Sequence, residues 1–345
     1  MSLCNGQEQQ KKTDVQELGL NATVKRVKEM AYNAKKQNEA IEKNPFGGIE
    51  EHLFDEQGRR IEQNDYNLDG GLSRRYTYQY DHKGHLTEDN EYNSDGSLNM
   101  KRTYQYDEEG RQTEMIIYNS EKSNKATYKY DDKGRLIEKN SYDEGGNLDW
   151  KTICEYDDKV HRIEENHYNA WGDFVSKYIY QYDEKGKLME EKEYDSHNKL
   201  YKRCTYQYDS KGNEIEVKEY YAYGIAHSWT YQYDEKGNKI EEKGYAGNGS
   251  LSYKETFKYD HKGHLIEKNF HYSEDRLYYR MTYQYDDHGN LTEECKIDGS
   301  GGDKQCRIYQ YEYDKQGNWV KKSEYGNDEP TIQTLIEREI EYHQN

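Results

Sequence analysis

Proline is almost absent from this chain, which contains only Pro45 and Pro330 in 345 residues. Both lie outside the part of the sequence that repeats. Proline has no backbone N–H and is excluded from the interior of a sheet. Its absence over such a long stretch therefore favours continuous backbone hydrogen bonding there.

Apolar residues are also scarce. Only 32% of the residues are hydrophobic, although 39 tyrosines are counted among them. No run of 18 apolar residues occurs, so no transmembrane helix is predicted. A large conventional core is excluded too. We expect tyrosine to supply the buried area while its hydroxyl stays in contact with water.

Basic residues are outnumbered by acidic ones. The chain has 50 Lys and Arg residues and 68 Asp and Glu residues, so its formal net charge is −18. This balance argues against nucleic acid and against an anionic membrane surface as partners. We interpret the acidity mainly as a means of keeping a large exposed sheet soluble.

What the sequence does contain is a repeat, read most clearly at residues 80–86 as Tyr-Asp-His-Lys-Gly-His-Leu. Similar stretches recur in steps of 24 to 28 residues. Their anchor aromatics are Phe54, Tyr80, Tyr106, Tyr130, Tyr156, Tyr182, Tyr208, Tyr233, Tyr259, Tyr285 and Tyr313. A fixed period of this length indicates one supersecondary unit copied many times.

Each repeat contains two turns. Asp follows every anchor aromatic, and Gly stands four residues after the anchor except where Val160 replaces it. Asp and Gly at these positions suit a type I turn in which Gly takes a positive φ. A β-branched residue disfavours positive φ, so we expect the turn at Val160 to be built differently. A similar second turn begins twelve residues later, as at Tyr92.

The stretches between the turns alternate with period two and are rich in Tyr, Thr and Ile, which is typical of strands. We predict an all-β fold, a long antiparallel meander of roughly two dozen short strands built from YD repeats of about 26 residues. Open sheets of that size curl, so we expect it to be twisted or wound into a spiral or partial shell.

Register can be predicted from the same unit. If Tyr80 pairs with Leu86 across the first turn, Tyr78 lies opposite Glu88. One face would then carry a Tyr–Glu ladder, and the other a β-branched row paired with Gln or Lys. Which face is buried stays open, because each mixes apolar and polar groups.

We divide the chain into a flexible leader (1–19), an N-terminal cap (20–50), the repeat sheet (51–325) and a C-terminal capping strand (326–345). In the cap we expect a first strand followed by a connection through Pro45, with a helical segment as the alternative. The alternating charges of the last strand would protect an exposed sheet edge.

The turn motif resembles the YD repeats of the Rhs-type family, and the resemblance covers about residues 50–325. Members are mostly bacterial secreted or surface proteins whose repeats form long coiled sheets. The chain looks more like short, stand-alone bacterial YD-repeat lipoproteins than like the toxin members of the family. Its repeat is longer than that of the toxin members, and about thirty residues follow the last anchor, too few for a toxin domain.

The amino terminus begins with three residues that look like a cloning remnant, followed by Cys4 and a polar tether. This start is similar to that of a mature bacterial lipoprotein, whose lipid is attached to the cysteine. It predicts an exported protein, anchored by lipid to the cell envelope at its periplasmic face or at the cell surface. The alternative is an ordinary disordered terminus.

Four further cysteines lie in the repeats. Cys154 and Cys204 are separated by four predicted strands, too far to form a bridge. Cys295 and Cys306 flank one turn symmetrically, where either a disulfide or two free buried thiols would fit. The spacing of Cys and His indicates no zinc site.

No catalytic constellation, metal site or cofactor site is predicted, because the Glu, Asp and His residues repeat with the unit. The second turns vary more from copy to copy and carry Trp171, Tyr221 and Tyr223. Exposed aromatics of this kind stack on sugars or anchor protein partners. The alternative is that they pack over the end of the sheet.

These observations predict a non-catalytic cell-envelope lipoprotein that serves as a binding or scaffold module for a glycan or a surface protein. One rival hypothesis is an accessory or immunity component of an Rhs-like toxin system. A second, less favoured, is an enzyme acting on polysaccharide. The sequence leaves the oligomeric state open.

Overall fold

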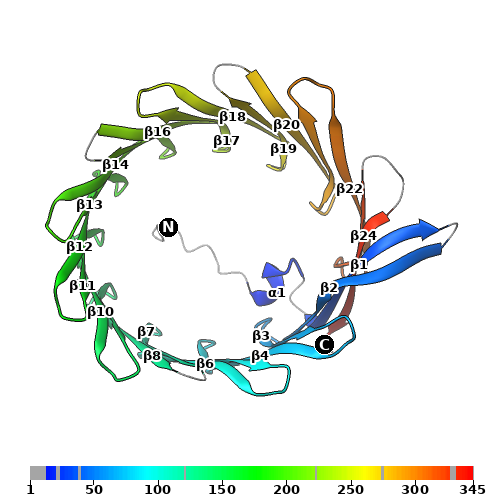
Figure 1. The fold of residues 1–345 in the computed structure, drawn as a ribbon, viewed down its shortest axis with the longest axis horizontal. Coiled ribbons are helices and arrows are strands. Elements are labelled where there is room, and N and C mark those ends of the chain that lie inside the picture. The colour runs from blue at the N-terminus through cyan, green and yellow to red at the C-terminus, as the bar shows by residue number, and fades with distance from the viewer. Residues whose placement is uncertain are drawn as a thin grey trace. The chain divides into compact units, whose positions relative to one another are not determined.

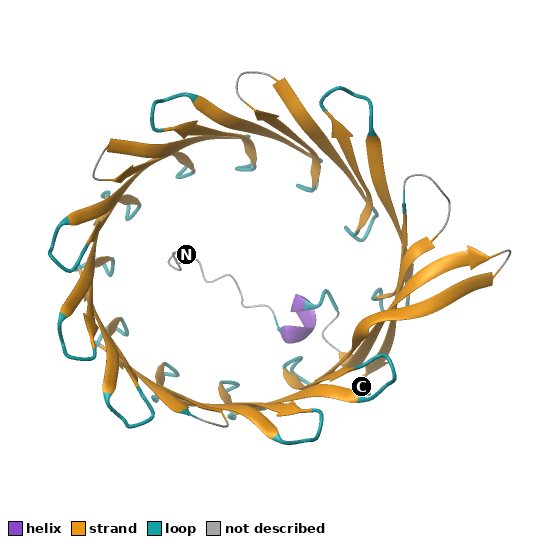
Figure 2. Ribbon diagram, viewed as in Figure 1, coloured by secondary structure: helices purple, strands orange, loops and turns teal. Residues whose placement is uncertain are grey.

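The structure is a computed structural model that describes residues 13–20, 24–37, 40–119, 122–221, 224–272, 276–326 and 332–344. It contains 24 β-strands, and the pairings between them are antiparallel (Figures 1 and 2). Among the described residues the only helix is α1 (Asp14–Glu17). The predicted all-β antiparallel meander is confirmed.

The strands follow one another in chain order. They are β1 (Val24–Gln37), β2 (Ala40–Phe54), β3 (Arg60–Tyr66), β4 (Leu72–Tyr80), β5 (Leu86–Asn93), β6 (Leu98–Tyr106), β7 (Gln112–Asn119), β8 (Ser123–Tyr130), β9 (Leu136–Tyr142), β10 (Leu148–Tyr156), β11 (Arg162–Asn169), β12 (Phe174–Tyr182), β13 (Leu188–Tyr194), β14 (Leu200–Tyr208), β15 (Glu214–Tyr221), β16 (Gly224–Tyr233), β17 (Lys239–Ala246), β18 (Leu251–Tyr259), β19 (Leu265–Tyr272), β20 (Arg276–Tyr285), β21 (Leu291–Asp298), β22 (Lys304–Tyr313), β23 (Trp319–Tyr325) and β24 (Ile332–Tyr342).

The chain forms two compact units. The first comprises residues 1–104, 117–121 and 308–345, and the second comprises residues 105–116 and 122–307. In the second unit, strands β8 to β21 pair consecutively. The first turns lie at one end of these strands and the second turns at the other (Figure 2).

In the first unit the first strand of the chain pairs with the last. Strand β1 lies between β2 and β24, with Val27 opposite both His52 and Ile340. Strand β24 in turn pairs with β23. The closing strand is thus paired on both sides, and the expectation that its charges protect an exposed edge is wrong.

Two small apolar clusters pack this unit. In the first, Val15 of α1 and Leu20 cover Val24, Val27 and Phe54. Val15 belongs to the segment 1–19 that the sequence predicts as a flexible leader, and Leu20 is the first residue of the predicted cap. In the second cluster, Leu335 of β24 packs with residues of β1 and β23: Tyr32, Ala34, Tyr325 and, from its own strand, Ile332.

Strands β1 and β2 are much longer than the others and form a hairpin arm. The segment through Pro45, predicted as a connection, is part of β2. The backbone pairing continues on both sides of it, with Tyr32 opposite Pro45 and Asn33 opposite Asn44. A register shift between Met30 and Tyr32 accommodates this irregular stretch.

The register across the first turns differs from the prediction by one residue. Tyr80 pairs with Leu86, but Gln79 pairs with Glu88 and Tyr78 with Asp89. Thr87 is the extra residue of a β-bulge, which shifts every later pair. Most of the glutamates therefore lie opposite the Gln or Lys that precedes the anchor, as Glu190 lies opposite Gln181 and Glu138 opposite Lys129, and the predicted Tyr–Glu ladder is wrong. The face that bears the anchor aromatics is called the tyrosine face below, and the other the glutamate face.

The turn at Val160 has the same hydrogen bonds as the glycine-containing turns. The Val160 N–H donates to the Asp157 carbonyl at 3.3 Å, and the Asp157 N–H donates to His161 at 2.9 Å. Val160 itself takes a φ of 78°. The expectation of a differently built turn is wrong, because the rest of the repeat imposes this conformation.

Candidate functional site

The repeated first turns are structural. Asp131 accepts hydrogen bonds from the backbone N–H groups of Lys133 and Arg135, at 3.0 and 2.9 Å. The Arg135 guanidinium pairs with the same carboxylate and lies 4.9 Å from the ring centre of Tyr156, the next anchor. The Tyr156 hydroxyl donates to the Leu136 carbonyl at 2.8 Å. The motif thus ties each repeat to the next.

The glutamates that follow the first turns are also paired with neighbouring side chains, as Glu138 shows. Glu138 contacts the Nζ atoms of Lys129 and Lys151, at 2.7 and 3.1 Å, and the side-chain amide of Asn140 at 2.8 Å. These hydrogen bonds, of which that from Lys129 is the strongest, lower the pKa of Glu138 to about 2. A carboxylate held in this way stays ionised and pairs with cations, which gives it a structural role in the sheet.

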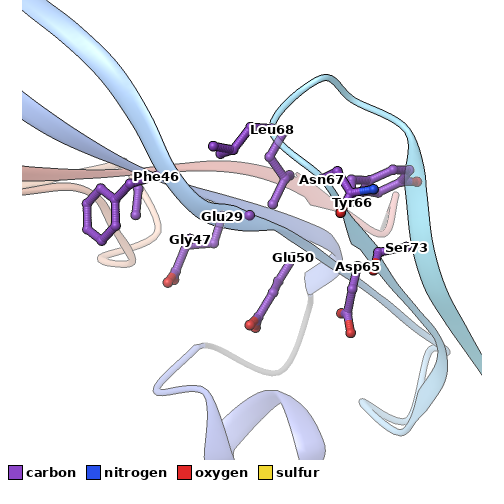
Figure 3. A pocket seen from close by; sticks show the side chains of 12 residues that line it. Glu29, Phe46, Gly47, Glu50, Asp65, Tyr66, Asn67, Leu68 and Ser73 are labelled. Atoms are coloured by element: carbon purple, nitrogen blue, oxygen red, sulfur yellow. The ribbon is translucent and has the colours of Figure 1, made fainter.

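A pocket of about 460 Å³ lies at the base of the hairpin arm (Figure 3). Its walls include Phe46, Tyr66 and three carboxylates, Glu29, Glu50 and Asp65. Glu50 pairs across strands with both other carboxylates. Burial, and then the charges of Asp65 and Glu29, raise the pKa of Glu50. The repulsion within this row is partly offset by Arg338, whose Nε donates to the Glu29 carboxylate at 2.8 Å.

The exposed aromatic side chains of the second unit gather at the end of the strands where the second turns lie, called the second-turn end below. They are Trp150, Trp171, Tyr201, Tyr221, Tyr272 and Tyr278. Neighbouring second turns are two strands apart, about 10 Å at ordinary strand spacing. The second-turn end therefore presents a row of rings.

Trp171 is the most exposed of these, with 85% of its surface accessible. The Asn169 side chain accepts hydrogen bonds from the N–H groups of Trp171 and Asp173, at 3.0 and 2.9 Å. These bonds fix the backbone of the turn while leaving the indole without cover. An exposed indole on a rigid turn can stack on a ligand at little entropic cost.

Tyr221 lies on β15, and its ring packs edge-on against Tyr201 of β14 with 5.6 Å between centres. Its hydroxyl donates to Glu219 at 2.9 Å. Tyr223 lies outside the described residues. Trp171, in the β11–β12 turn, and Tyr221, at the end of β15, are separated by the β13–β14 turn, so they share an end of the sheet without forming one pocket.

Sequence reasoning missed Tyr201. It also missed three rings, Tyr253, Phe270 and Tyr272, of a five-ring cluster on β18, β19 and β20. In this cluster Phe270 stacks with Tyr253 and with Tyr279, at 5.9 and 5.3 Å between centres. Tyr272 and Tyr278 extend the cluster to the surface. The sequence holds one sign of this cluster, which is the glycine at position 244 within a strand. Any side chain there would collide with the Tyr253 ring.

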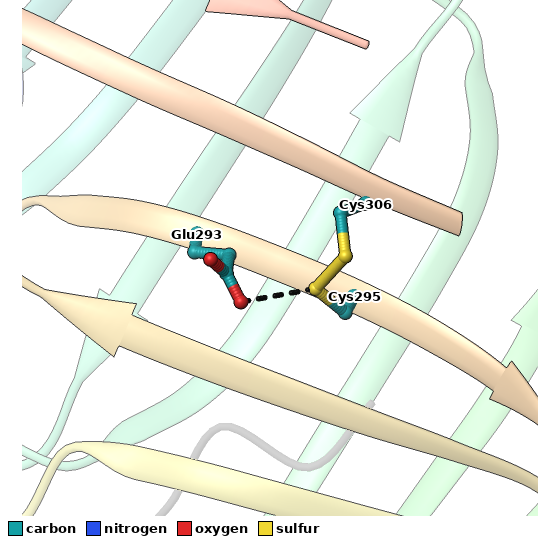
Figure 4. Close-up of side chains that lie close together, drawn as sticks. All are labelled: Glu293, Cys295 and Cys306. Carbon is teal, nitrogen blue, oxygen red and sulfur yellow. Dashed lines mark hydrogen bonds between the residues drawn. A yellow bond between two sulfur atoms is a disulfide. The ribbon is translucent and has the colours of Figure 1, made fainter. Parts of the chain in front are cut away.

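Cys295 and Cys306 form a disulfide, and a carboxylate oxygen of Glu293 lies 3.1 Å from the Cys295 sulfur (Figure 4). Among the described residues these three are the one group of metal-ligand types close enough to share an ion. The two sulfurs are bonded to each other, so they offer no thiolate ligand in this state. Cys154 and Cys204 are free thiols.

Cys4 lies outside the described residues, so the structure does not bear on its lipidation. In the part of the chain that the structure describes, no helix has the length and apolar character needed to cross a membrane.

No protein-family model matches the sequence, and no curated protein matches it. Among solved structures, a Tc holotoxin pore of Photorhabdus luminescens is similar to 83% of this chain, with 13% identity and a TM-score of 0.45. A TcdB2–TccC3 structure is similar to 80% of it, with 13% identity and a TM-score of 0.32. The chain spans only 19% and 22% of the length of these toxin chains.

A porin-like protein from Bacteroides uniformis is similar to 93% of this chain and is itself covered over 97% of its length, with 14% identity and a TM-score of 0.28. In the structure, the Tyr-Asp turns repeat with the same backbone hydrogen bonds, and each turn joins two neighbouring strands of the sheet. Membership of a particular family stays a resemblance.

Proposed function

We propose that this protein is a non-catalytic binding scaffold that contacts its ligand through the second-turn end of the second unit. The observation that carries the proposal is the concentration of exposed aromatic rings there. Most tyrosines of the chain are half-buried within the sheet, whereas these rings face solvent on or beside short turns. Such rings are the groups that most often dominate recognition.

A glycan is the ligand class that suits this surface. Tyr221 stands beside the charged groups of Glu219 and Lys202, with the Lys202 nitrogen 5.9 Å from its ring centre. A ring flanked by a carboxylate and an ammonium offers a stacking face and hydrogen-bond partners for hydroxyl groups. A surface protein anchored on the same rings is the alternative ligand.

We place the scaffold at the cell envelope, held there by a lipid on Cys4. The support is the sequence alone: a cysteine followed by a polar tether, joined to a YD-repeat sheet. A Cys4→Ser variant, expressed behind the signal peptide of a bacterial lipoprotein, should leave the membrane fraction and lose the lipid mass. Retention in that fraction would contradict the lipid anchor and leave the binding proposal untouched.

The binding proposal is tested on an array of host and bacterial glycans. The protein should bind a related set of sugars saturably, and the variants Trp171→Ala and Tyr201→Ala should each weaken that binding at least tenfold. Met189→Ala, which removes an exposed side chain near a first turn, serves as the control and should bind normally. Equal binding by all variants would exclude this surface, and a blank array would exclude the glycan.

A further inference from the structure

Buried polar atoms without a hydrogen-bond partner are rare in folded proteins, and each calls for an explanation. Four such side-chain atoms occur among the described residues. One, Nδ1 of His271, lies in the second unit. The other three lie in the first unit: Nδ1 of His52, Nε of Arg60 and Nη1 of Arg338.

These three residues share the tyrosine face near α1. His52 is two residues from Phe54, whose ring α1 covers, and therefore lies on the same face of β2. Glu50 also lies on this face and pairs with Glu29, which pairs in turn with Arg338. The Arg60 backbone N–H donates to Asp14 of α1 at 2.6 Å.

Both arginines are held in place by other contacts, and each of the three side chains keeps one nitrogen without a hydrogen-bond partner. Arg338 Nε donates to Glu29 at 2.8 Å, and its guanidinium lies 3.5 Å from the ring centre of Trp319. Arg60 Nη1 donates to the Gln63 side chain at 3.2 Å. The arrangement leaves donors that are already oriented and desolvated.

The charges nearby agree with a shared site. Burial, and then the charges of Arg60 and Arg338, lower the pKa of His52 to about 4, so the imidazole is neutral near pH 7. A neutral imidazole carries one N–H. His52 and Arg338 are both more than nine-tenths buried in their side chains.

We propose that one oxyanion, of the carboxylate or phosphate type, accepts hydrogen bonds from His52, Arg60 and Arg338 between α1 and the sheet. Guanidinium groups bind such oxygens with short, charge-assisted hydrogen bonds. The ion would satisfy all three donors at once and tie β2, β3 and β24 together. This site is independent of the second-turn end of the second unit.

The test is thermal unfolding of the full chain after exhaustive dialysis into chloride. Phosphate, sulfate and acetate are then titrated in at constant ionic strength. A bound oxyanion should raise Tm saturably, by about 5 °C at concentrations far above its Kd. The anion that raises Tm at the lowest concentration shows which oxyanion geometry the site prefers.

Arg338→Met and Arg60→Met should abolish the rise. Arg135→Met in the second unit, whose Nε and Nη1 already have partners, is the matched control and should keep it. If the methionine variants do not fold, a crystal grown with selenate replaces them, and an anomalous peak within hydrogen-bond distance of the three nitrogens is expected. A uniform, unsaturable salt effect or an empty, water-filled site would overturn the proposal.

Discussion

At the residue scale, the YD motif is explained by the number of contacts that two side chains make. The aspartate closes its own turn, and the anchor tyrosine reaches back to the previous repeat: the Tyr208 hydroxyl donates to the Leu188 carbonyl at 3.0 Å. Phe54 is the informative exception. Its ring is buried beneath α1, where a hydroxyl without a partner would be costly.

Val160→Gly should stabilise the second unit by about 1 kcal/mol, because a non-glycine residue in the left-handed region carries strain of that order. Urea unfolding of the variant and the wild type measures the difference. The reverse change, Gly263→Val, is the control: its φ is +92° with open space around it, so strain alone should destabilise it. A destabilised Val160→Gly variant would show that the valine side chain contributes packing that exceeds the strain.

At the scale of the element, each hairpin has a turn whose backbone N–H groups donate to an ionised carboxylate. Ion pairs between charged side chains join its two strands, as between Lys129 and Glu138. Although burial opposes the shift, hydrogen bonds from the His85 backbone and ring lower the pKa of Asp81 to about 2. The other first-turn and strand carboxylates with resolved shifts mostly move in the same direction, as at Asp107, Asp209 and Glu241. The hairpins therefore depend on ionised acids.

Stability should consequently be lost in acid. A carboxylate whose pKa is lower in the folded state contributes fully above its unfolded pKa, near 4, and loses that contribution as pH falls toward 2. Urea midpoints measured at pH 7, 5.5 and 2.5 should be similar at the first two values, which lie above the unfolded pKa, and clearly lower at the third. A midpoint that is unchanged at pH 2.5 would contradict this account of the turns.

At the scale of the whole chain, the pairing of the first strand with the last is the decisive contact. It joins residues more than 300 positions apart, as in the hydrogen bond from Arg338 to Glu29, which has a sequence separation of 309. In the first unit this pairing covers the backbone of both terminal strands, which would otherwise be open to pairing with other chains.

Leu335→Ala tests this contact. Leu335 is fully buried where β24 meets β1, so the truncation should cost about 3 kcal/mol. It should also make the two chain ends more sensitive to limited proteolysis. Leu200→Ala, at an exposed position, should change stability by about 0.5 kcal/mol or less. Equal effects of the two substitutions would show that the contact between β1 and β24 contributes little to the free energy of unfolding.

The candidate site was predictable in part. Trp171 stands out in the sequence because it departs from a repeating turn, and the structure leaves it almost fully exposed. Tyr201 was not recognised, since its contact with Tyr221 depends on how two neighbouring strands align. The unpartnered nitrogens of His52, Arg60 and Arg338 belong to strands brought together by the β1–β24 pairing, which no local pattern reveals.

The sequence by itself determined the strands, both turns of each repeat and the antiparallel meander, because these depend on contacts within about 26 residues that every copy restates. Only the tertiary structure decided the register, since a single bulge residue such as Thr87 shifts the pairing by one residue and so changes which side chains lie opposite each other. It also decided the conformation of Val160, the packing of α1 and the joining of β1 to β24. Those features are set by long-range packing, in which distant residues override local preference.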